Sequence, residues 1–480
     1  MATGMKGLAK DTVIYGLTNI VSKFLNWLLA PFYIRVLADA AEYGIVTNLY
    51  AWVSVVLVVL TLGLETGLFR YLGTEDDKSS VYRTCLRLLS VACGVFLLGG
   101  FLFLEPVSSA LGYPQHASYV GMFMVIVAMD ALMSLPFAYL RYEKKALKFA
   151  GFKFLFVVLN IAFNLFFLFF VGEFTPFYIF LSNLLASGVE FLCILPVLKP
   201  AFGGSFSRDL FRSLVRYCWP LVLLGLAGNF NKMAGQILIP ALAPDRETGL
   251  TMVGIFGGNL KISVIMVMFL QAFRFAYDPF VFSKMKAKDA FGAYRVAMNY
   301  FVLAGCLIFL FVMYWMPLFR HIVRPDYYSG LVIVPIMMAS EVLFGIYYNL
   351  SIWYKVSDRT GFGALFSLIG LFVTVGIILW GVPRFGIIAC AWAAVTCNGV
   401  MLLLSYFLGR KYYPIPYDEW RVLLGLAVTA LFYFGGEMIA SFDSQTLTLA
   451  VRTLLLLPFL AVMMPILTPE IRTLIPRLKK

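Results

Sequence analysis

The sequence predicts an all-α polytopic membrane protein with about fourteen transmembrane helices, and three observations carry that prediction. Hydrophobic residues make up 61% of the 480 residues and charged residues only 13%, whereas a soluble domain is typically about 45–50% apolar and about 25% charged. Long apolar runs recur between short charged intervals along the whole chain. Lys and Arg gather in alternate intervals, which is the positive-inside pattern of membrane proteins.

The apolar runs have the length that a membrane helix needs, roughly 20 residues. Five stretches contain no Asp, Glu, Lys or Arg: 88–104, 154–172, 296–319, 360–383 and 385–409. In chain order we expect helices near 12–35, 44–68, 84–104, 118–140, 152–172, 174–198, 212–240, 251–275, 293–318, 330–354, 361–382, 385–409, 420–440 and 446–467. Runs of this length do not fit a β-barrel, whose strands alternate over about ten residues.

The distribution of positive charge predicts the topology. If Met1 lies in the cytoplasm, the cytoplasmic loops and tails hold 29 of the 38 Lys and Arg, the outer loops hold six, and three lie within helices. Both termini are therefore predicted to be cytoplasmic. The net charge of +13 follows from this asymmetry, so we expect no nucleic-acid partner. The first apolar run carries Lys23 and no small-residue cleavage site follows it, so we expect it to remain as the first helix.

Weak internal repetition divides the chain into two halves offset by about 210 residues. The matched segments are Asn19 and Asn26 with Asn229 and Gln236, residues 43–46 with 253–256, 81–83 with 293–295, and 141–144 with 353–355. We expect an N-terminal six-helix lobe at 1–200, a C-terminal six-helix lobe at 201–411, and two further helices with a cytoplasmic tail at 412–480. Parallel repeats of this kind favour alternating access, with a substrate site near mid-membrane between the halves.

Polar side chains enter the membrane on the opening helix of each half. A charged residue at bilayer depth costs about 2.5–3.5 kcal/mol, so it faces a cavity or a partner. The candidate substrate-binding residues are Asn19, Lys23, Asn26, Asn229, Lys232, Gln236 and Lys261. A cavity lined by lysines and amides suits an anionic headgroup that carries hydroxyls. The alternative is that each lysine pairs with a carboxylate or extends to the interface.

Carboxylates within the predicted helices have two interpretations. Glu65, Asp130 and Glu341 are candidates for ion coupling or for charge pairing with the lysines, and Glu190 is a further candidate partner. Asp130 and Glu341 lie in the fourth and tenth helices, which correspond in the repeat. Glu65 could instead pair with Arg70 at the end of the second helix.

Catalytic and cofactor signatures are missing from the sequence. It contains no GxxxxGK[ST] loop for a nucleotide and no HExxH zinc motif. The two histidines lie far apart near predicted outer loops, and the seven cysteines show no CxxC spacing. We therefore expect no enzyme activity, no catalytic residue, no metal and no cofactor.

The opening of the chain carries a family resemblance. Its most specific segments are NIVSK at 19–23, APFYIRVL at 30–37, EYG at 42–44, LGLE at 62–65 and Phe69-Arg70. With these segments, its length and its six-plus-six-plus-two helices, the chain resembles the O-antigen type of polysaccharide flippase in the multidrug/oligosaccharidyl-lipid/polysaccharide exporter superfamily.

The resemblance implies a multi-pass transporter of the bacterial inner membrane. Such a flippase moves undecaprenyl-diphosphate-linked oligosaccharide units to the outer leaflet by alternating access, for surface polysaccharide biosynthesis. Its partners would be the lipid-linked oligosaccharide, membrane lipids and the glycan polymerase machinery. The family's charged central cavity would map here onto Lys23, Lys232 and Lys261.

Three other functions stay open at this point. Lipid II flippases are similar but place several arginines in their first helices, whereas this chain has lysine and asparagine. A multidrug exporter of the same superfamily would present carboxylates to its cationic substrates. A membrane glycan polymerase or ligase would carry a large basic outer loop, and the longest outer segments here, 105–117 and 319–329, are short. The last two helices are expected on the flank of the second lobe.

Overall fold

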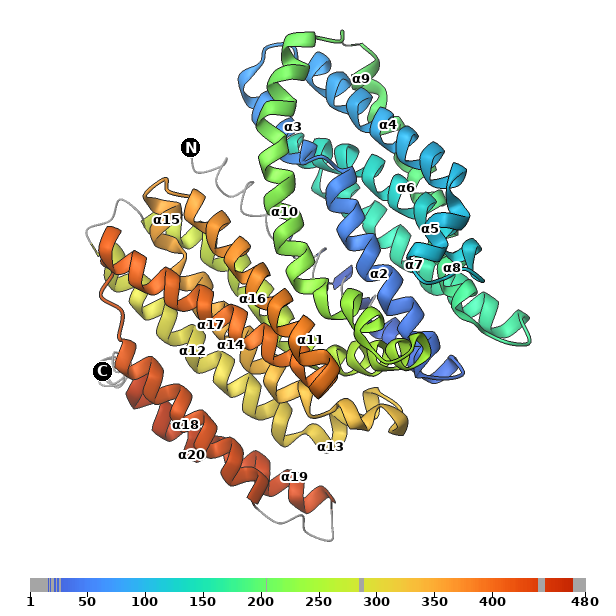
Figure 1. The fold of residues 1–480 in the computed structure, drawn as a ribbon. Helices are drawn as coiled ribbons and strands as arrows, with labels where there is room; N and C mark the ends of the chain where they lie inside the picture. The colour runs from blue at the N-terminus through green and yellow to red at the C-terminus, as the bar shows by residue number, and fades with distance from the viewer. Residues whose placement is uncertain are drawn as a thin grey trace. The chain divides into compact units, whose positions relative to one another are not determined.

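The computed structural model of the chain describes residues 16, 18, 21–22, 24–25, 27–203, 205–284, 289–438 and 445–468. Within these ranges the chain is helical and forms no β-strand (Figure 1). Thirteen of the helices described there are long and apolar enough to cross a bilayer, and a shorter apolar helix, Trp27–Val36, lies where the first predicted helix ends. The chain is therefore an all-α polytopic membrane protein, as the sequence predicts.

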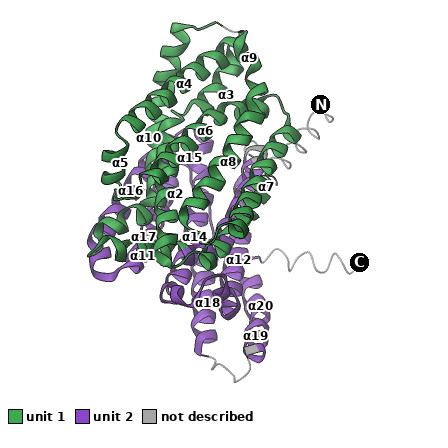
Figure 2. Ribbon diagram, turned by 90° about the vertical axis from the view of Figure 1, so that its right-hand side faces the viewer, with its two compact units in different colours: residues 1–257 green, residues 258–480 purple. Residues whose placement is uncertain are grey.

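The chain divides into two compact units, residues 1–257 and residues 258–480, which we call unit 1 and unit 2 (Figure 2). The helices of unit 1 are α2 (Ala40–Leu60), α3 (Leu64–Thr74), α4 (Lys78–Leu102), α5 (Leu104–Ala110), α6 (Ala117–Tyr142), α7 (Ala146–Phe170), α8 (Pro176–Ile194), α9 (Lys199–Phe202), α10 (Arg208–Leu242) and the start of α11 (Arg246–Lys284), with a 3₁₀ turn at Leu195–Leu198. Unit 1 includes α10 because this helix packs along α2. The repeat boundary near residue 200 stays a prediction.

Unit 2 holds the rest of α11 and the helices that follow it. These are α12 (Ala290–Tyr314), α13 (Met316–Phe319), α14 (Ile333–Leu350), α15 (Ile352–Val356), α16 (Gly361–Phe385), α17 (Ile387–Tyr412), α18 (Glu419–Met438), α19 (Gln445–Leu454) and α20 (Leu456–Leu467), with 3₁₀ turns at Arg320–Ile322 and Pro325–Gly330. Most of the predicted helix limits lie within a few residues of these. The largest differences are at α2, which ends at Leu60 and not near the predicted 68, and at α11, which extends past the predicted 275. The helices α4 and α7 each begin six residues before the predicted 84 and 152.

Side-chain caps begin several of these helices. Asp39 accepts a hydrogen bond from the Glu42 amide at the start of α2, at 2.9 Å. Asp77 accepts one from the Ser80 amide at the start of α4, at 3.0 Å. The Ser80 hydroxyl also donates to Asp77 and holds the pKa of that carboxyl below its ordinary value. These acceptors satisfy amides that have no partner within the helix.

The start of α11 crosses α2 at backbone contact. A Cβ atom placed on Gly44 would overlap the carbonyl oxygen of Leu250, and one placed on Gly254 would overlap the carbonyl oxygen of Ala40. Small residues allow helix backbones to approach this closely in membranes. The two contacts are reciprocal at an offset of 210 residues, because 40 and 44 correspond to 250 and 254. Two copies of the predicted repeat, related by a two-fold axis, would make a reciprocal contact of this kind.

The core of unit 2 lies between α11, α12, α14 and α20. Its almost fully buried side chains include Met266, Phe301, Val302, Met338, Phe459 and Met463. The terminal helices are tied to α12 by hydrogen bonds as well. The Tyr314 hydroxyl donates to the Phe432 carbonyl oxygen at 2.6 Å, and the Trp315 indole donates to the Thr453 hydroxyl at 3.0 Å. Within unit 2, α18 and α20 therefore pack against α12 (Figure 1).

Candidate functional site

The polar face predicted on the opening helix of the second half lies on α10. The Asn229 side chain donates to the Ser54 carbonyl oxygen of α2 at 2.5 Å, and to the Ser54 hydroxyl at 2.8 Å. The Gln236 carbonyl oxygen accepts a hydrogen bond from the Asn48 side chain, also on α2, at 2.6 Å. Lys232, on the same helix, has an exposed side chain. Asn229 and the Gln236 backbone thus hold α10 against α2, while Lys232 extends from the helix.

The remaining predicted substrate-binding residues fall in two places. Asn19, Lys23 and Asn26 lie outside the described residues. Lys261 lies on α11 in unit 2 and is partly buried. Its neighbour Asn259 is fully buried and donates to the Tyr327 carbonyl oxygen at 2.9 Å.

A charge cluster in unit 1, with one almost fully buried member and two partly buried ones, joins α6, α7 and α8. The Glu190 side chain is only 2% exposed, and its Oε1 lies 3.3 Å from Nζ of Lys153. That ammonium also lies 3.7 Å from the centre of the Phe137 ring, a contact that attracts a cation. Asp130, near the middle of α6, interacts electrostatically with both Lys153 and Glu190. We call Asp130, Lys153 and Glu190 the charge triad.

The charge triad has one more negative group than positive groups when all three side chains are ionised. In a low-dielectric interior an uncompensated charge is costly. One proton bound by either carboxyl group makes the cluster neutral.

Polar side chains continue from the triad along α8. The spacing of Asn183, Ser187 and Glu190 places all three on one face of the helix. The Ser187 hydroxyl donates to Asn183 at 3.2 Å, and the Asn183 side chain donates to the Tyr50 hydroxyl of α2 at 2.6 Å. Asp130 interacts with Ser187 and with Tyr50 as well. The triad is thus part of a polar network inside unit 1.

Lys153 is the functional candidate that the sequence analysis missed. It lies inside α7, within the helix expected at 152–172, and Glu190 and Phe137 stabilise its charge within the helical bundle. Two spacings could have indicated the site. Lys153, Asn160 and Asn164 lie on one face of α7 and Asn183, Ser187 and Glu190 on one face of α8.

The other candidate carboxylates have different surroundings. Glu65 pairs with Arg141 of α6, not with Arg70. The Arg70 guanidinium lies 4.2 Å from the centre of the Tyr217 ring on α10. Glu341 lies on α14 and is partly buried. In the described part of the chain, no group of three His, Cys, Asp or Glu side chains gathers where it could hold a metal ion.

A second charged cluster lies in unit 2 around Tyr348 of α14. Its hydroxyl donates to Asp278 of α11 at 2.6 Å, and Asp278 lies 3.7 Å from Nζ of Lys355. The Lys355 ammonium and the Arg274 guanidinium lie 3.9 and 4.4 Å from the centre of the Tyr348 ring. This cluster carries a net positive charge and joins α11 to α14 and α15.

Solved structures with this fold are membrane transporters. The lipid II flippase MurJ in an inward closed conformation has a TM-score of 0.74 at 12% identity, covering 96% of this chain and 99% of MurJ. An inward-facing multidrug resistance MATE family transporter of the MOP superfamily has a TM-score of 0.66 at 14% identity, covering 81% of this chain and 94% of the transporter. An outward-facing MATE family transporter of the same superfamily has a TM-score of 0.61 at 14% identity, covering 84% and 95%. A search of curated proteins returns no match.

The chain therefore shares the fold of these polytopic transporters. The family model described as "Polysaccharide biosynthesis protein" matches residues 8–274, more than half of the chain. The chain belongs to this polysaccharide biosynthesis family. It is a multi-pass membrane protein by its apolar helices, and the structural neighbours named above are transporters and a flippase.

Proposed function

We propose that this protein is a flippase that moves undecaprenyl-diphosphate-linked oligosaccharide units across the bacterial inner membrane. It carries them from the cytoplasmic to the outer leaflet for surface polysaccharide biosynthesis. The family match over residues 8–274 carries the proposal. The two repeats at 1–200 and 201–411 would alternate the access of the substrate to the two sides. A glycan polymerase would use the exported units.

Positive charge within the membrane helices supports an anionic substrate. Lys232 extends from α10 and Lys261 lies on α11, both in helices long and apolar enough to span a bilayer. We propose that these lysines, together with Lys23, attract the diphosphate, because lysine binds phosphate as a point charge. The direction of transport is also favourable, since each negative charge leaving a negative interior gains about 2.3 kcal/mol per 100 mV.

The charge triad supplies a candidate for ion coupling. We propose that Asp130 shares one proton with Glu190 and Lys153, and that the proton is exchanged during each transport cycle. The burial of Glu190 and the excess of one negative group in the triad support this role. We propose Glu65 as a structural partner of Arg141, because that ion pair joins α3 to α6.

The competing functions predict different substrates. A multidrug exporter would carry organic cations, and a lipid II flippase would carry the peptidoglycan precursor. Acidic side chains in the described helices are engaged with basic ones at Glu65, Glu190 and Asp278. That pairing leaves them less suited to a cationic substrate.

Depletion of the protein in its own bacterium tests the proposal. Cells that lack it should lose surface polysaccharide and accumulate undecaprenyl-diphosphate-linked oligosaccharide, measured by mass spectrometry of the extracted lipids. Re-expression of the wild-type chain should reverse both effects. Normal surface polysaccharide with increased sensitivity to organic cations would instead identify a multidrug exporter.

A further inference from the structure

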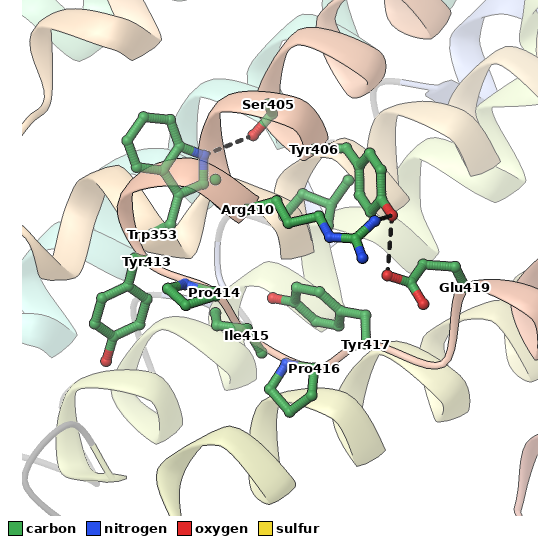
Figure 3. Close-up of a pocket in the computed structure, with 12 residues that line it drawn as sticks. Trp353, Ser405, Tyr406, Arg410, Tyr413, Pro414, Ile415, Pro416, Tyr417 and Glu419 are labelled. Carbon is green, nitrogen blue, oxygen red and sulfur yellow. Dashed lines mark hydrogen bonds between the residues drawn. The ribbon is translucent and has the colours of Figure 1, made fainter.

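A cavity with both charged and apolar side chains in its lining lies in unit 2 where α17 ends and α18 begins. Its volume is about 350 Å³, and its lining includes Tyr406, Arg410, Tyr413, Tyr417 and Glu419 (Figure 3). Small-molecule sites in proteins usually measure about 300–1,000 Å³. The cavity therefore has room for a small polar group.

Two side chains of opposite charge, Arg410 and Glu419, line this cavity, and the Tyr406 hydroxyl lies between them. Nη1 of Arg410 donates to the Tyr406 hydroxyl at 3.1 Å, and that hydroxyl donates to Oε1 of Glu419 at 3.0 Å (Figure 3). Both charged side chains are exposed. Arg410 has five N–H donors in all and Glu419 has two acceptor oxygens. The cavity thus contains one positive and one negative group, and each has hydrogen-bonding capacity left for a ligand.

Hydrogen bonds and two prolines restrain the walls of the cavity. The Tyr417 hydroxyl donates to the Asn349 carbonyl oxygen at 3.2 Å. The Trp353 indole donates to the Ser405 hydroxyl at 3.1 Å. Between the two helices the chain runs through Pro414 and Pro416, whose rings restrict the backbone. Rigid walls lower the entropy cost of binding.

The position of the cavity matches the headgroup layer of a bilayer. It lies between one span that ends at Tyr412 and another that begins at Glu419, in an interval predicted to be cytoplasmic. Phe407 and Trp420, on the flanking helices, are 65% and 76% exposed. Large exposed aromatic side chains at the ends of spans are typical of the membrane interface.

We propose that this cavity binds the headgroup of a zwitterionic phospholipid of the phosphoethanolamine type. The phosphate binds Arg410, and the ammonium group binds Glu419 and the faces of the tyrosine rings. A purely anionic headgroup would place its charge beside the Glu419 carboxylate. A neutral sugar would leave both charges without a partner. The separation of the charges by Tyr406 fits a ligand that carries both signs.

Native mass spectrometry of the delipidated protein tests this site. The probes are phosphatidylethanolamine and phosphatidylglycerol with the same acyl chains, together with soluble glycerophosphoethanolamine as a competitor. The wild-type protein should retain phosphatidylethanolamine in preference to phosphatidylglycerol. Glycerophosphoethanolamine should reduce that retention, because the headgroup alone carries the recognition.

Matched variants separate the two charges. Arg410→Gln should weaken retention of phosphatidylethanolamine about tenfold, the effect of losing a charged hydrogen bond. Glu419→Gln should abolish the preference for phosphatidylethanolamine over phosphatidylglycerol. Lys411→Gln, which removes a neighbouring charge that does not line the cavity, should leave the preference unchanged.

Three results would overturn the proposal. One is equal retention of both lipids by the wild-type protein, and another is preferential retention of phosphatidylglycerol. The third is displacement of bound lipid by a neutral oligosaccharide but not by glycerophosphoethanolamine, which would assign the cavity to a sugar. These measurements use the wild-type chain, so they decide the question even if a variant fails to fold.

Discussion

Inside unit 1, the charge of Glu190 is stabilised by a small number of neighbouring side chains. Glu190 is almost fully buried beside Lys153, and that ammonium also contacts the Phe137 ring. Removing one member of a buried ion pair leaves the other charge without compensation. Replacing both members with apolar side chains removes that cost. The triad therefore has a stability role that can be separated from its role in transport.

Substitution of Lys153 tests the stability role. Lys153→Met should lower the free energy of unfolding by about 1–3 kcal/mol, because the buried Glu190 carboxyl group then loses its charged partner. The double variant Lys153→Met with Glu190→Leu should recover most of that loss. Thermal unfolding in detergent measures both effects, with the exposed Lys148→Met as the control. If Lys153→Met has the melting temperature of the wild-type protein, the pair of Lys153 and Glu190 contributes nothing to stability.

Substitution of Asp130 tests the proton role. In Asp130→Asn the new side chain has nearly the same size and shape as that of Asp, but it carries no charge and cannot bind or release a proton. In liposomes it should make glycolipid translocation insensitive to an imposed pH gradient, while the response to membrane potential remains. An unchanged response to the pH gradient would remove Asp130 from the coupling mechanism.

At the scale of elements, the contact between α2 and α11 connects the predicted repeat to the observed packing. Gly44 and Gly254 correspond in the repeat, and each lies against a backbone carbonyl of the other helix. The absence of side chains at these two positions allows that contact. A side chain at either position would force the helices apart.

Glycine substitutions test this crossing. Gly44→Ala and Gly254→Ala should each destabilise the protein by about 1–3 kcal/mol or more, the usual cost of overpacking. Gly228→Ala is a matched control, because nothing lies within 4 Å of a Cβ atom there. Melting temperatures that fall equally in all three variants would point to a general effect of glycine replacement.

Much of the helical arrangement could be predicted from hydropathy, and the side-chain contacts could not. Lipid as solvent requires long apolar runs, so the sequence reveals the spans directly. Hydropathy does not show which face of a helix meets which neighbour. The sequence therefore does not show that Lys153 faces Glu190, and sequence proximity suggests Arg70 for Glu65 in place of its partner Arg141. The network of Tyr50, Asp130 and Ser187 likewise depends on tertiary packing.

At the scale of the whole molecule, topology is the property that the sequence predicts and that labelling can check. Reporter fusions at 75–78, 203–206, 286–289 and 411–418 should be cytoplasmic, and fusions at 112–116 and 324–327 should be outside. The reason is the division of Lys and Arg between alternate loops. A single reversed site would break the alternation and the parallel arrangement of the repeats.

Translocation of a defined glycolipid by the purified protein tests the central claim most directly. Liposomes would contain an undecaprenyl-diphosphate-linked oligosaccharide with a fluorescent sugar, and a quencher that cannot cross the membrane would report how much of it faces outward. The wild-type protein should expose the inner-leaflet pool far faster than protein-free liposomes do. Lys232→Gln should slow this exposure, and Lys232→Arg should retain more of the rate because the charge remains. A rate equal to that of protein-free liposomes, with active transport of an organic cation, would contradict the flippase assignment.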